Sequence, residues 1–297
     1  MPSVNYHEKQ FEVFIQDEIR TRSFGAKTYF APVGQVVEAK VGYDLGVQTR
    51  GWHEIWKILG VPFLPGRDIH SWNSRLTPSD AVSSRATNLF FQFKRPKVLK
   101  GSRAAHLARF GGPYLRFKAD RSANGNYPSQ HELLEELEQF SAGQALVRYA
   151  APVCFDYLEL EDAATRGKLL ESTIFIEPSR FMPDHTACCY TTPHNALVNP
   201  EPMEIEPETW PEFIRKVSTA TREGQEVDRA VFGALDWTAT ALPANETPWS
   251  GHAAQGAELP FWNDLSGETR DFLNAALTTS ANLERLGLTW YLGLRAA

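Results

Sequence analysis

The chain has 297 residues, of which 42% are hydrophobic and 22% are charged, close to the averages of globular proteins. This composition excludes an intrinsically disordered chain, and no run of about 18 uncharged apolar residues offers a membrane-spanning helix. The formal net charge of −6 argues against a uniformly basic nucleic-acid-binding protein, although a local basic face remains compatible with it.

The first twenty residues mix charged and apolar side chains, unlike the charged-then-apolar layout of a signal peptide. The three cysteines, Cys154, Cys188 and Cys189, are odd in number and two of them are adjacent, so a disulfide framework is not expected. The sequence therefore predicts a cytoplasmic protein in a reducing compartment, with no membrane attachment.

Hydrophobic periodicity and turn residues predict the elements of the first half of the chain. In order these are an amphipathic helix over 7–20, one or two strands over 33–48, a short helix over 51–59, and strands over 87–94 and 113–119. A stretch rich in Pro, Ser, Arg and Asp, about 60–86, precedes the strand at 87. A loop of this length within a compact domain is often functional or mobile.

The second half opens on a helix over 129–140, with Ser129 as N-cap and Glu132 three residues on, the capping-box pattern. We expect strands over 145–151, 172–177 and 186–191, and helices over 208–222 and 266–287. The pattern predicts an α/β fold with a core over residues 1–200 and an insertion of about 51–86. Residues 201–297 form a partly helical C-terminal extension, which either completes that domain or mediates assembly.

Two short motifs stand in this predicted core, GYD (42–44) and FFQFKRP (90–96). Alternation along the strand sends Phe91 and Phe93 to one face, and Gln92 and Lys94 to the other. The pair of motifs resembles the PD-(D/E)XK nuclease superfamily, in the branch that writes its second motif as Q-x-K, as Mrr-like restriction endonucleases do. The resemblance covers roughly residues 8–151. It implies a restriction-endonuclease-like central mixed sheet flanked by helices.

The resemblance also implies an activity, the metal-dependent hydrolysis of phosphodiester bonds in DNA, in restriction or anti-phage defence. Asp44 matches the metal-binding aspartate, Gln92 the position usually held by Glu or Asp, and Lys94 the catalytic lysine. Glu38, six residues before Asp44, is a further candidate ligand. Accessory positions are Glu12 or Glu18, matching an acid on the first helix of some members, and Gln130, matching a glutamine of some branches. A homo-oligomer or a regulatory protein partner is expected if the chain is a toxic effector.

These residue types suit the chemistry. A hard cation such as Mg²⁺ or Mn²⁺ binds carboxylates and water, polarises the phosphoryl oxygen and lowers the pKa of a bound water. A lysine beside it can orient or deprotonate that water, or neutralise the developing charge. The sequence departs from the family in two respects. Gln92 is neutral and binds a metal through its carbonyl alone, more weakly than a carboxylate does. The gap from Asp44 to Gln92 is also longer than in many members, which an insertion over 51–86 would explain.

Basic residues are concentrated between residues 94 and 121, where nine Lys and Arg stand against one acid, Asp120. This stretch indicates either a face for the DNA backbone or an ordinary solvated surface. The candidate nucleic-acid-binding residues are Arg95, Lys97, Lys100 and Arg103.

A rival interpretation is a non-catalytic binding or assembly module that keeps the nuclease fold without a competent metal site. The neutral Gln92 and the acidic net charge favour it. Each candidate also has a structural explanation: Asp44 can hold a turn, and Lys94 can guard an edge strand against aggregation. Potential zinc ligands gather at Asp184, His185, Cys188, Cys189 and His194. Because adjacent cysteines on a strand point to opposite faces, buried thiols are the favoured interpretation there.

Overall fold

The computed structural model describes residues 4–23, 28–29, 85–100, 109–119, 121, 129–140, 145–223, 225–241 and 288–295, with single positions between 267 and 282. The chain divides into two compact units. Unit 1 comprises Met1–Ala26 and Phe90–Thr219, and unit 2 comprises Lys27–Leu89 and Ala220–Ala297. Within the described residues five α-helices are present: α1 (Glu8–Ser23), α5 (Gln130–Phe140), α6 (Tyr157–Thr165), α7 (Trp210–Glu223) and α8 (Val227–Ala241).

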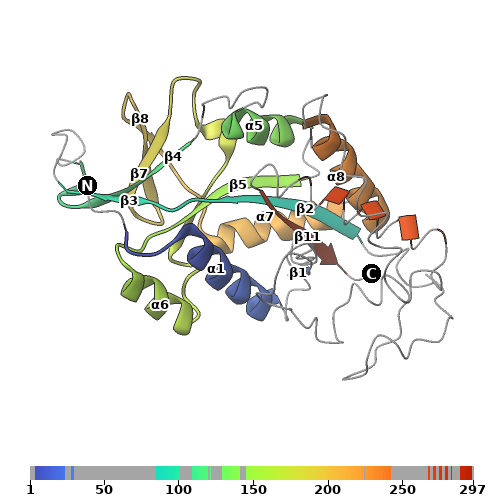
Figure 1. Cartoon of the computed structure of the whole chain (residues 1–297), viewed down its shortest axis with the longest axis horizontal. Helices are drawn as coiled ribbons and strands as arrows, with labels where there is room; N and C mark the ends of the chain where they lie inside the picture. Colours follow the sequence, from blue (N-terminus) through green and yellow to red (C-terminus); the bar gives the residue numbers. More distant parts are fainter. Residues whose placement is uncertain are drawn as a thin grey trace. The chain divides into compact units, whose positions relative to one another are not determined.

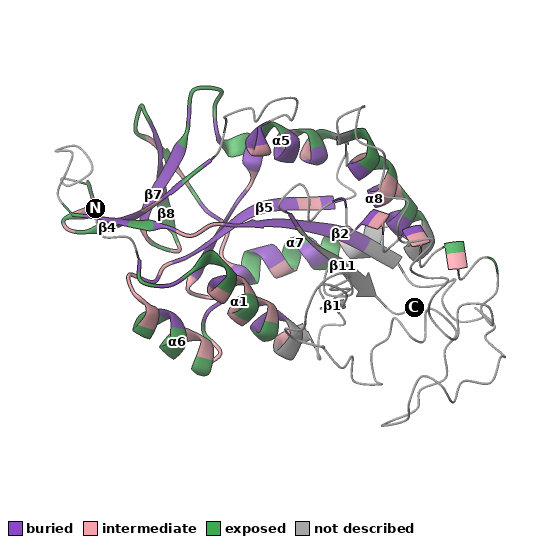
Figure 2. Ribbon diagram, in the orientation of Figure 1, coloured by how far each residue is buried: buried purple, intermediate pink, exposed green. Residues whose placement is uncertain are grey.

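Unit 1 is built around a mixed sheet in which β5 (Ala145–Pro152) lies between β2 (Arg85–Phe93) and β6 (Thr173–Ile176). β5 and β6 are antiparallel, with Tyr149 opposite Ile176. All but one residue of β5 are buried, as expected for a strand covered on both faces (Figure 2). The side chains of unit 1 are therefore arranged on the two faces of β2 and β5.

Aromatic packing defines one face of this sheet. Phe91 and Phe93 stack with their centroids 5.9 Å apart. Phe93 meets Phe11 of α1 edge-on at 5.6 Å, and Phe91 meets Phe213 of α7 at 5.4 Å. Such ring pairs stabilise by about 0.5–1.5 kcal/mol each beyond the area they bury. Helices α1 and α7 therefore cover the face that carries Phe91 and Phe93, while α5 lies on the other side of β5 (Figure 1).

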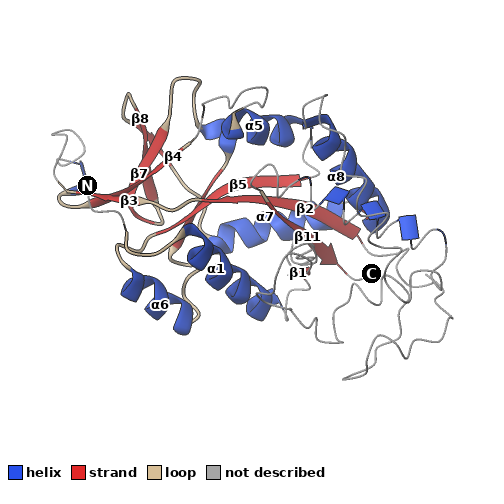
Figure 3. Ribbon diagram, viewed as in Figure 1, coloured by secondary structure: helices blue, strands red, loops and turns tan. Residues whose placement is uncertain are grey.

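A second sheet of unit 1 has five antiparallel strands in the order β3 (Lys97–Leu99), β4 (Tyr114–Lys118), β7 (Ala187–Thr192), β8 (Asn195–Asn199) and β9 (Met203–Ile205) (Figure 3). Its inner face packs against the mixed sheet. Phe117 lies 5.7 Å from the ring of Tyr149, and the Tyr190 hydroxyl donates to the Pro152 carbonyl at 3.1 Å. Because side chains alternate along each strand, the outer face of this sheet carries a different set of residues.

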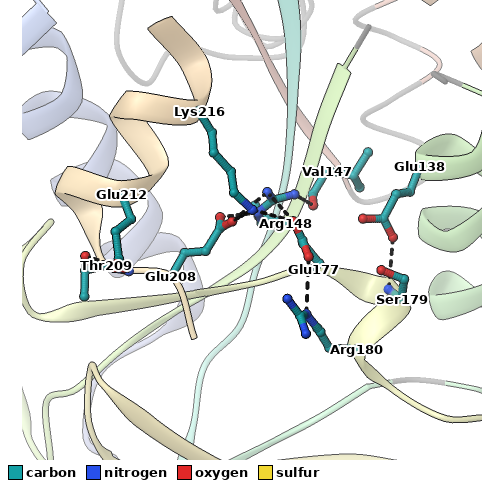
Figure 4. A network of polar contacts seen from close by, with 10 residues as sticks. All are labelled: Glu138, Val147, Arg148, Glu177, Ser179, Arg180, Glu208, Thr209, Glu212 and Lys216. Carbon is teal, nitrogen blue, oxygen red and sulfur yellow. Dashed lines mark hydrogen bonds and ion pairs between the residues drawn. The ribbon is translucent and has the colours of Figure 1, made fainter. Parts of the chain in front are cut away.

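A buried ion network joins β5, β6 and α7 (Figure 4). Arg148 is 2% exposed, and its Nε and Nη2 donate to the Glu208 carboxylate at 2.7 and 3.1 Å. Its Nη2 also donates to Glu177 at 2.9 Å, and Nη1 donates to the Val147 carbonyl. Lys216 pairs with both carboxylates. Burial raises the pKa of Glu177, but the hydrogen bond from Lys216 and the charge of Arg148 outweigh it and lower that pKa.

Unit 2 contains β1 (Thr28–Tyr29), β10 (Gln225–Glu226), β11 (Thr289–Arg295), α8 and the first residues of β2. β1 pairs antiparallel with β11, Thr28 lying opposite Gly293, and β10 pairs antiparallel with the start of β2. The Asn88 side chain donates to the Ala230 carbonyl at 2.9 Å and so fixes α8 to β2.

The structure confirms the expected α/β class and most of the expected elements among the described residues. The helices over 7–20, 129–140 and 208–222 are α1, α5 and α7, and the strands over 87–94 and 145–151 are β2 and β5. The expected elements over 33–48 and 51–59, and the stretch of about 60–84, lie outside the described residues. Among the helices that are described, none has both the length and the apolar character to span a bilayer.

Candidate active site

Lys94 and Gln130 meet at the end of β2. The Lys94 Nζ donates to Gln130 Oε1 at 3.0 Å across 36 residues of sequence. The same ammonium lies 5.8 Å from the centroid of the Tyr149 ring, on whose π face a cation is attracted. The Lys94 amide donates to the Ala150 carbonyl at 2.9 Å, which keeps the backbone in the ladder just beyond the strand. Lys94 is therefore half-buried. Gln130 and the Tyr149 ring hold its ammonium, and the Ala150 carbonyl holds its backbone amide.

The start of α5 fixes Gln130, its first residue. The predicted capping box is present: the Glu132 amide donates to Ser129 Oγ at 3.2 Å, and the Ser129 amide donates to Glu132 Oε2 at 2.8 Å. Hydrogen bonding of the Glu132 carboxyl to the backbone amide and the side chain of Ser129 lowers the pKa of that carboxyl. These reciprocal hydrogen bonds fix the first turn of α5 and so orient Gln130 toward Lys94.

Gln92 precedes Lys94 by two residues and is 3% exposed. The neighbours Phe91 and Phe93 pack on α7 and α1, so strand alternation turns Gln92 and Lys94 to the opposite face. A buried amide and a half-buried ammonium thus share one face of β2. The structure agrees here with the alternation expected from FFQFK.

The carboxylates that the resemblance assigns to the metal, Asp44 and Glu38, lie outside the described residues, as does Arg103. Among the described residues, no group of three or more His, Cys, Asp or Glu side chains is placed to hold a metal ion. The described part of the site therefore offers amide oxygens and an ammonium. Any Mg²⁺ or Mn²⁺ would need the carboxylates that the sequence assigns elsewhere.

Glu12 and Glu18 lie on α1, the helix that packs on the Phe93 side of the sheet. Glu18 is 6% exposed and accepts hydrogen bonds from the amides of Leu169 and Leu170 at 2.7 and 3.4 Å. Its burial raises the pKa of the carboxyl, which those two hydrogen bonds partly oppose. Glu12 accepts from Gln16 and pairs with Lys9 at 3.4 Å. The contacts of both acids serve the helix and the turn it packs on.

The basic candidates lie just after β2. The Arg95 amide donates to Glu8 Oε2 at 3.0 Å. Arg95 is half-buried, whereas Lys97 and Lys100 are exposed. All three cysteines are buried, and none of them is in a disulfide. Burial raises the pKa of Cys154 to about 12 and raises that of Cys188 well above its ordinary value, so these two thiols are protonated at neutral pH.

A polar network that the sequence did not indicate lies beneath Gln130. His131 is fully buried; its Nδ1 is 2.8 Å from the Tyr149 hydroxyl and its Nε2 is 2.6 Å from Nη2 of Arg121. Burial first, then the charges of Arg121 and Lys94, lower the pKa of His131 to about 4. The ring is neutral at pH 7, so Nε2 accepts from Arg121 and Nδ1 donates to Tyr149. The Glu135 oxygen 3.1 Å from Nε2 consequently makes no ion pair with the ring.

This network predicts an acid-sensitive stability. The unfolded chain protonates His131 at its ordinary pKa of about 6.5, but the folded chain does so only near 4. Because the unfolded state binds the proton first, the free energy of unfolding falls as pH drops from about 6.5 to about 4, by roughly 3 kcal/mol. Urea unfolding across this range should show the fall in the wild type and much less of it in His131→Gln. An identical pH dependence in both proteins would exclude His131 as its source.

Searches for relatives of this chain among protein-family models, curated proteins and solved structures found no match. The candidate site therefore depends on the contacts of its own residues. Among the residues predicted from sequence, the structure brings Lys94 and Gln130 into contact and turns Gln92 to their face. Glu12 and Glu18 belong to the helix on the other face of the sheet.

Proposed function

We propose that this chain is a metal-dependent nuclease that hydrolyses phosphodiester bonds in DNA, with a restriction-endonuclease-like core. The observation that carries the proposal is the 3.0 Å hydrogen bond between Lys94 and Gln130. The two residues were singled out separately by their likeness to a nuclease motif. The mixed sheet with α1 on one face and α5 on the other supports the same fold. Restriction or anti-phage defence is the setting that the resemblance suggests.

Lys94 is suited to the developing charge of phosphodiester cleavage. Its ammonium is held by Gln130 and by the Tyr149 ring, so little reorganisation is needed when negative charge grows on a phosphoryl oxygen. Partial burial also weakens the screening of that charge by water. Gln130 acts through Lys94, which makes it a positioning residue in this proposal.

Mg²⁺ or Mn²⁺ would supply the polarisation of the phosphoryl oxygen and a water of lowered pKa. The residues of this chain that would hold it are Asp44 and Glu38 through carboxylates and Gln92 through its amide carbonyl. An amide oxygen is a ligand that Mg²⁺ accepts, and the buried Gln92 lies on the face of Lys94. Carboxylate and amide oxygens are the ligand types that such a hard cation accepts.

One observation favours the rival, a non-catalytic binding module. The described side of the site contains a neutral amide at Gln92 where nuclease motifs usually carry a carboxylate. Of the other described residues of the site, Lys94 repels a cation and Gln130 binds one weakly. A module of this kind would bind DNA or a protein partner without cutting.

Cleavage of plasmid and linear DNA tests the proposal. We expect cutting by the wild type with Mg²⁺ or Mn²⁺, none with EDTA, and a loss of about 100-fold or more in Asp44→Ala, because removing even an outer partner of a metal costs 10–100-fold. Asp17→Ala, an exposed acid on α1, is the matched control and should cut normally. DNA binding without cutting by the wild type would favour the rival, and full activity in Asp44→Ala would refute the assigned site.

A further inference from the structure

The outer face of the five-stranded sheet carries three cations on two neighbouring strands. Lys97 of β3 lies directly opposite Arg116 of β4, and Lys118 follows two residues on. Because side chains alternate along a strand, Arg116 and Lys118 point to the same side. Lys97 and Lys118 are exposed and Arg116 is half-buried. We call these three residues the β3–β4 face.

The same side of the sheet also carries an apolar cluster, and Glu204 of β9 lies on this side opposite Leu197. Leu99, Tyr114, Cys189 and Leu197 form a buried cluster against which Phe110 packs. Arg116 pairs across the strands with Cys189, so it stands between the apolar cluster and the two lysines. The face is thus divided into a covered apolar end and an open basic end.

Acids are absent from the strands around these cations. The sequences KVL, YLRFK and ACCYTT of β3, β4 and β7 contain no Asp or Glu, in a chain whose net charge is −6. The nearest acid within the described strands of this sheet is Glu204 on β9, three strands from β4, and it pairs with Arg109. At about 4.8 Å per strand it lies roughly 14 Å away, beyond the distance at which salt screens exposed charges.

Edge protection explains only part of this arrangement. A lysine on an edge strand is a common guard against aggregation, and it accounts for Lys97 on β3. Arg116 of β4, however, is paired on both sides, with Lys97 of β3 and with Cys189 of β7, whereas Lys118 pairs with Ala187 of β7 beyond the end of β3. Like charges directly opposite on neighbouring strands are also destabilising, by up to about 1 kcal/mol. A bound anion would relieve that repulsion. Three adjacent cations fit a polyanion, whose charges repeat along its length.

We propose that the β3–β4 face binds the phosphate backbone of duplex DNA; this inference rests on the proposed function. The Arg116 guanidinium can take a phosphate in bidentate fashion, and the two lysines act as point charges. The face positions the duplex, and reading of its sequence is left to other residues.

Salt-dependent binding to a short DNA duplex, measured by fluorescence anisotropy in EDTA, separates this inference from cleavage. The triple variant Lys97→Gln, Arg116→Gln, Lys118→Gln should reduce the slope of log Kobs against log salt by about 2 to 3, since each phosphate contact contributes about 0.9. The matched control replaces three other cations of unit 1, Lys9→Gln, Arg166→Gln and Lys168→Gln, all exposed. Its net charge changes equally, but its slope should change by less than about 1.

Equal slopes for the two triple variants, or no salt-dependent binding by the wild type, would overturn the β3–β4 face. Tighter binding to an RNA duplex of the same sequence would overturn the choice of DNA. Binding lost in the first triple variant while the wild type fails to cut with Mg²⁺ would support the face and refute the nuclease. Normal DNA cutting and normal DNA binding by that variant would support the nuclease and refute the β3–β4 face.

Discussion

Replacing Arg148 with alanine is expected to lower the free energy of unfolding by about 3 kcal/mol or more, because breaking a buried ion network leaves uncompensated charges. Arg148 is 2% exposed and satisfies Glu177 and Glu208, which are 21% and 13% exposed. Glu208 would keep Lys216, and Glu177 would keep Lys216 and Arg180, whose side chains are 46% and 59% exposed. Chemical unfolding followed by circular dichroism measures the change.

Arg180→Ala is the matched control for this prediction. Arg180 pairs with the same Glu177 carboxylate at 3.3 Å, but its side chain is 59% exposed. Exposed pairs contribute about 0–1 kcal/mol, so the control should lose less than about 1 kcal/mol. Similar losses in the two variants would contradict the view that burial gives the Arg148 network its effect.

Lys94→Ala is expected to reduce the rate of metal-dependent DNA cleavage by about 100- to 1,000-fold, the usual effect of removing one preorganised group that stabilises transition-state charge. The fold should survive, since Lys94 is only half-buried and its strand stays paired to β5 through the Lys94 amide. Cleavage rates at saturating metal give the effect. Far-ultraviolet circular dichroism checks that the variant is folded.

Lys168→Ala is the control, because Lys168 is an exposed lysine on a turn of the same unit. It removes the same charge from the chain and should leave the cleavage rate within a factor of about two, since distant exposed charges are screened by salt. If Lys94→Ala cuts as fast as this control, Lys94 has no part in the chemistry.

Local patterns in the sequence predicted the elements that frame the site. The alternation in FFQFK gave the two faces of β2, and Ser129 with Glu132 gave the start of α5, since both depend on neighbours in sequence. Helix α6 was missed. Its start is fixed by Asp156, whose side chain accepts from the Glu159 amide, and of its nine residues only Leu160 is buried. Signals of that length are weak without their tertiary surroundings.

The long-range contacts could not be read from the sequence. The partners of Arg148 come from residues 177 and 208, and those of His131 from residues 121 and 149. Only the packing of β5 against β6, α5 and α7 brings these groups together. Gln130 was predicted from resemblance, yet its bond to Lys94 depends on how α5 lies on the sheet.

The most direct test of the central claim, that Lys94 and Gln130 act as one unit in cleavage, is a double-mutant cycle on kcat/KM for DNA. Lys94→Ala, Gln130→Ala and the double variant are compared with the wild type. If Gln130 acts only by positioning Lys94, the double variant should be no slower than Lys94→Ala alone. Losses that simply add would contradict a shared role, and wild-type rates in both single variants would show that the pair is structural.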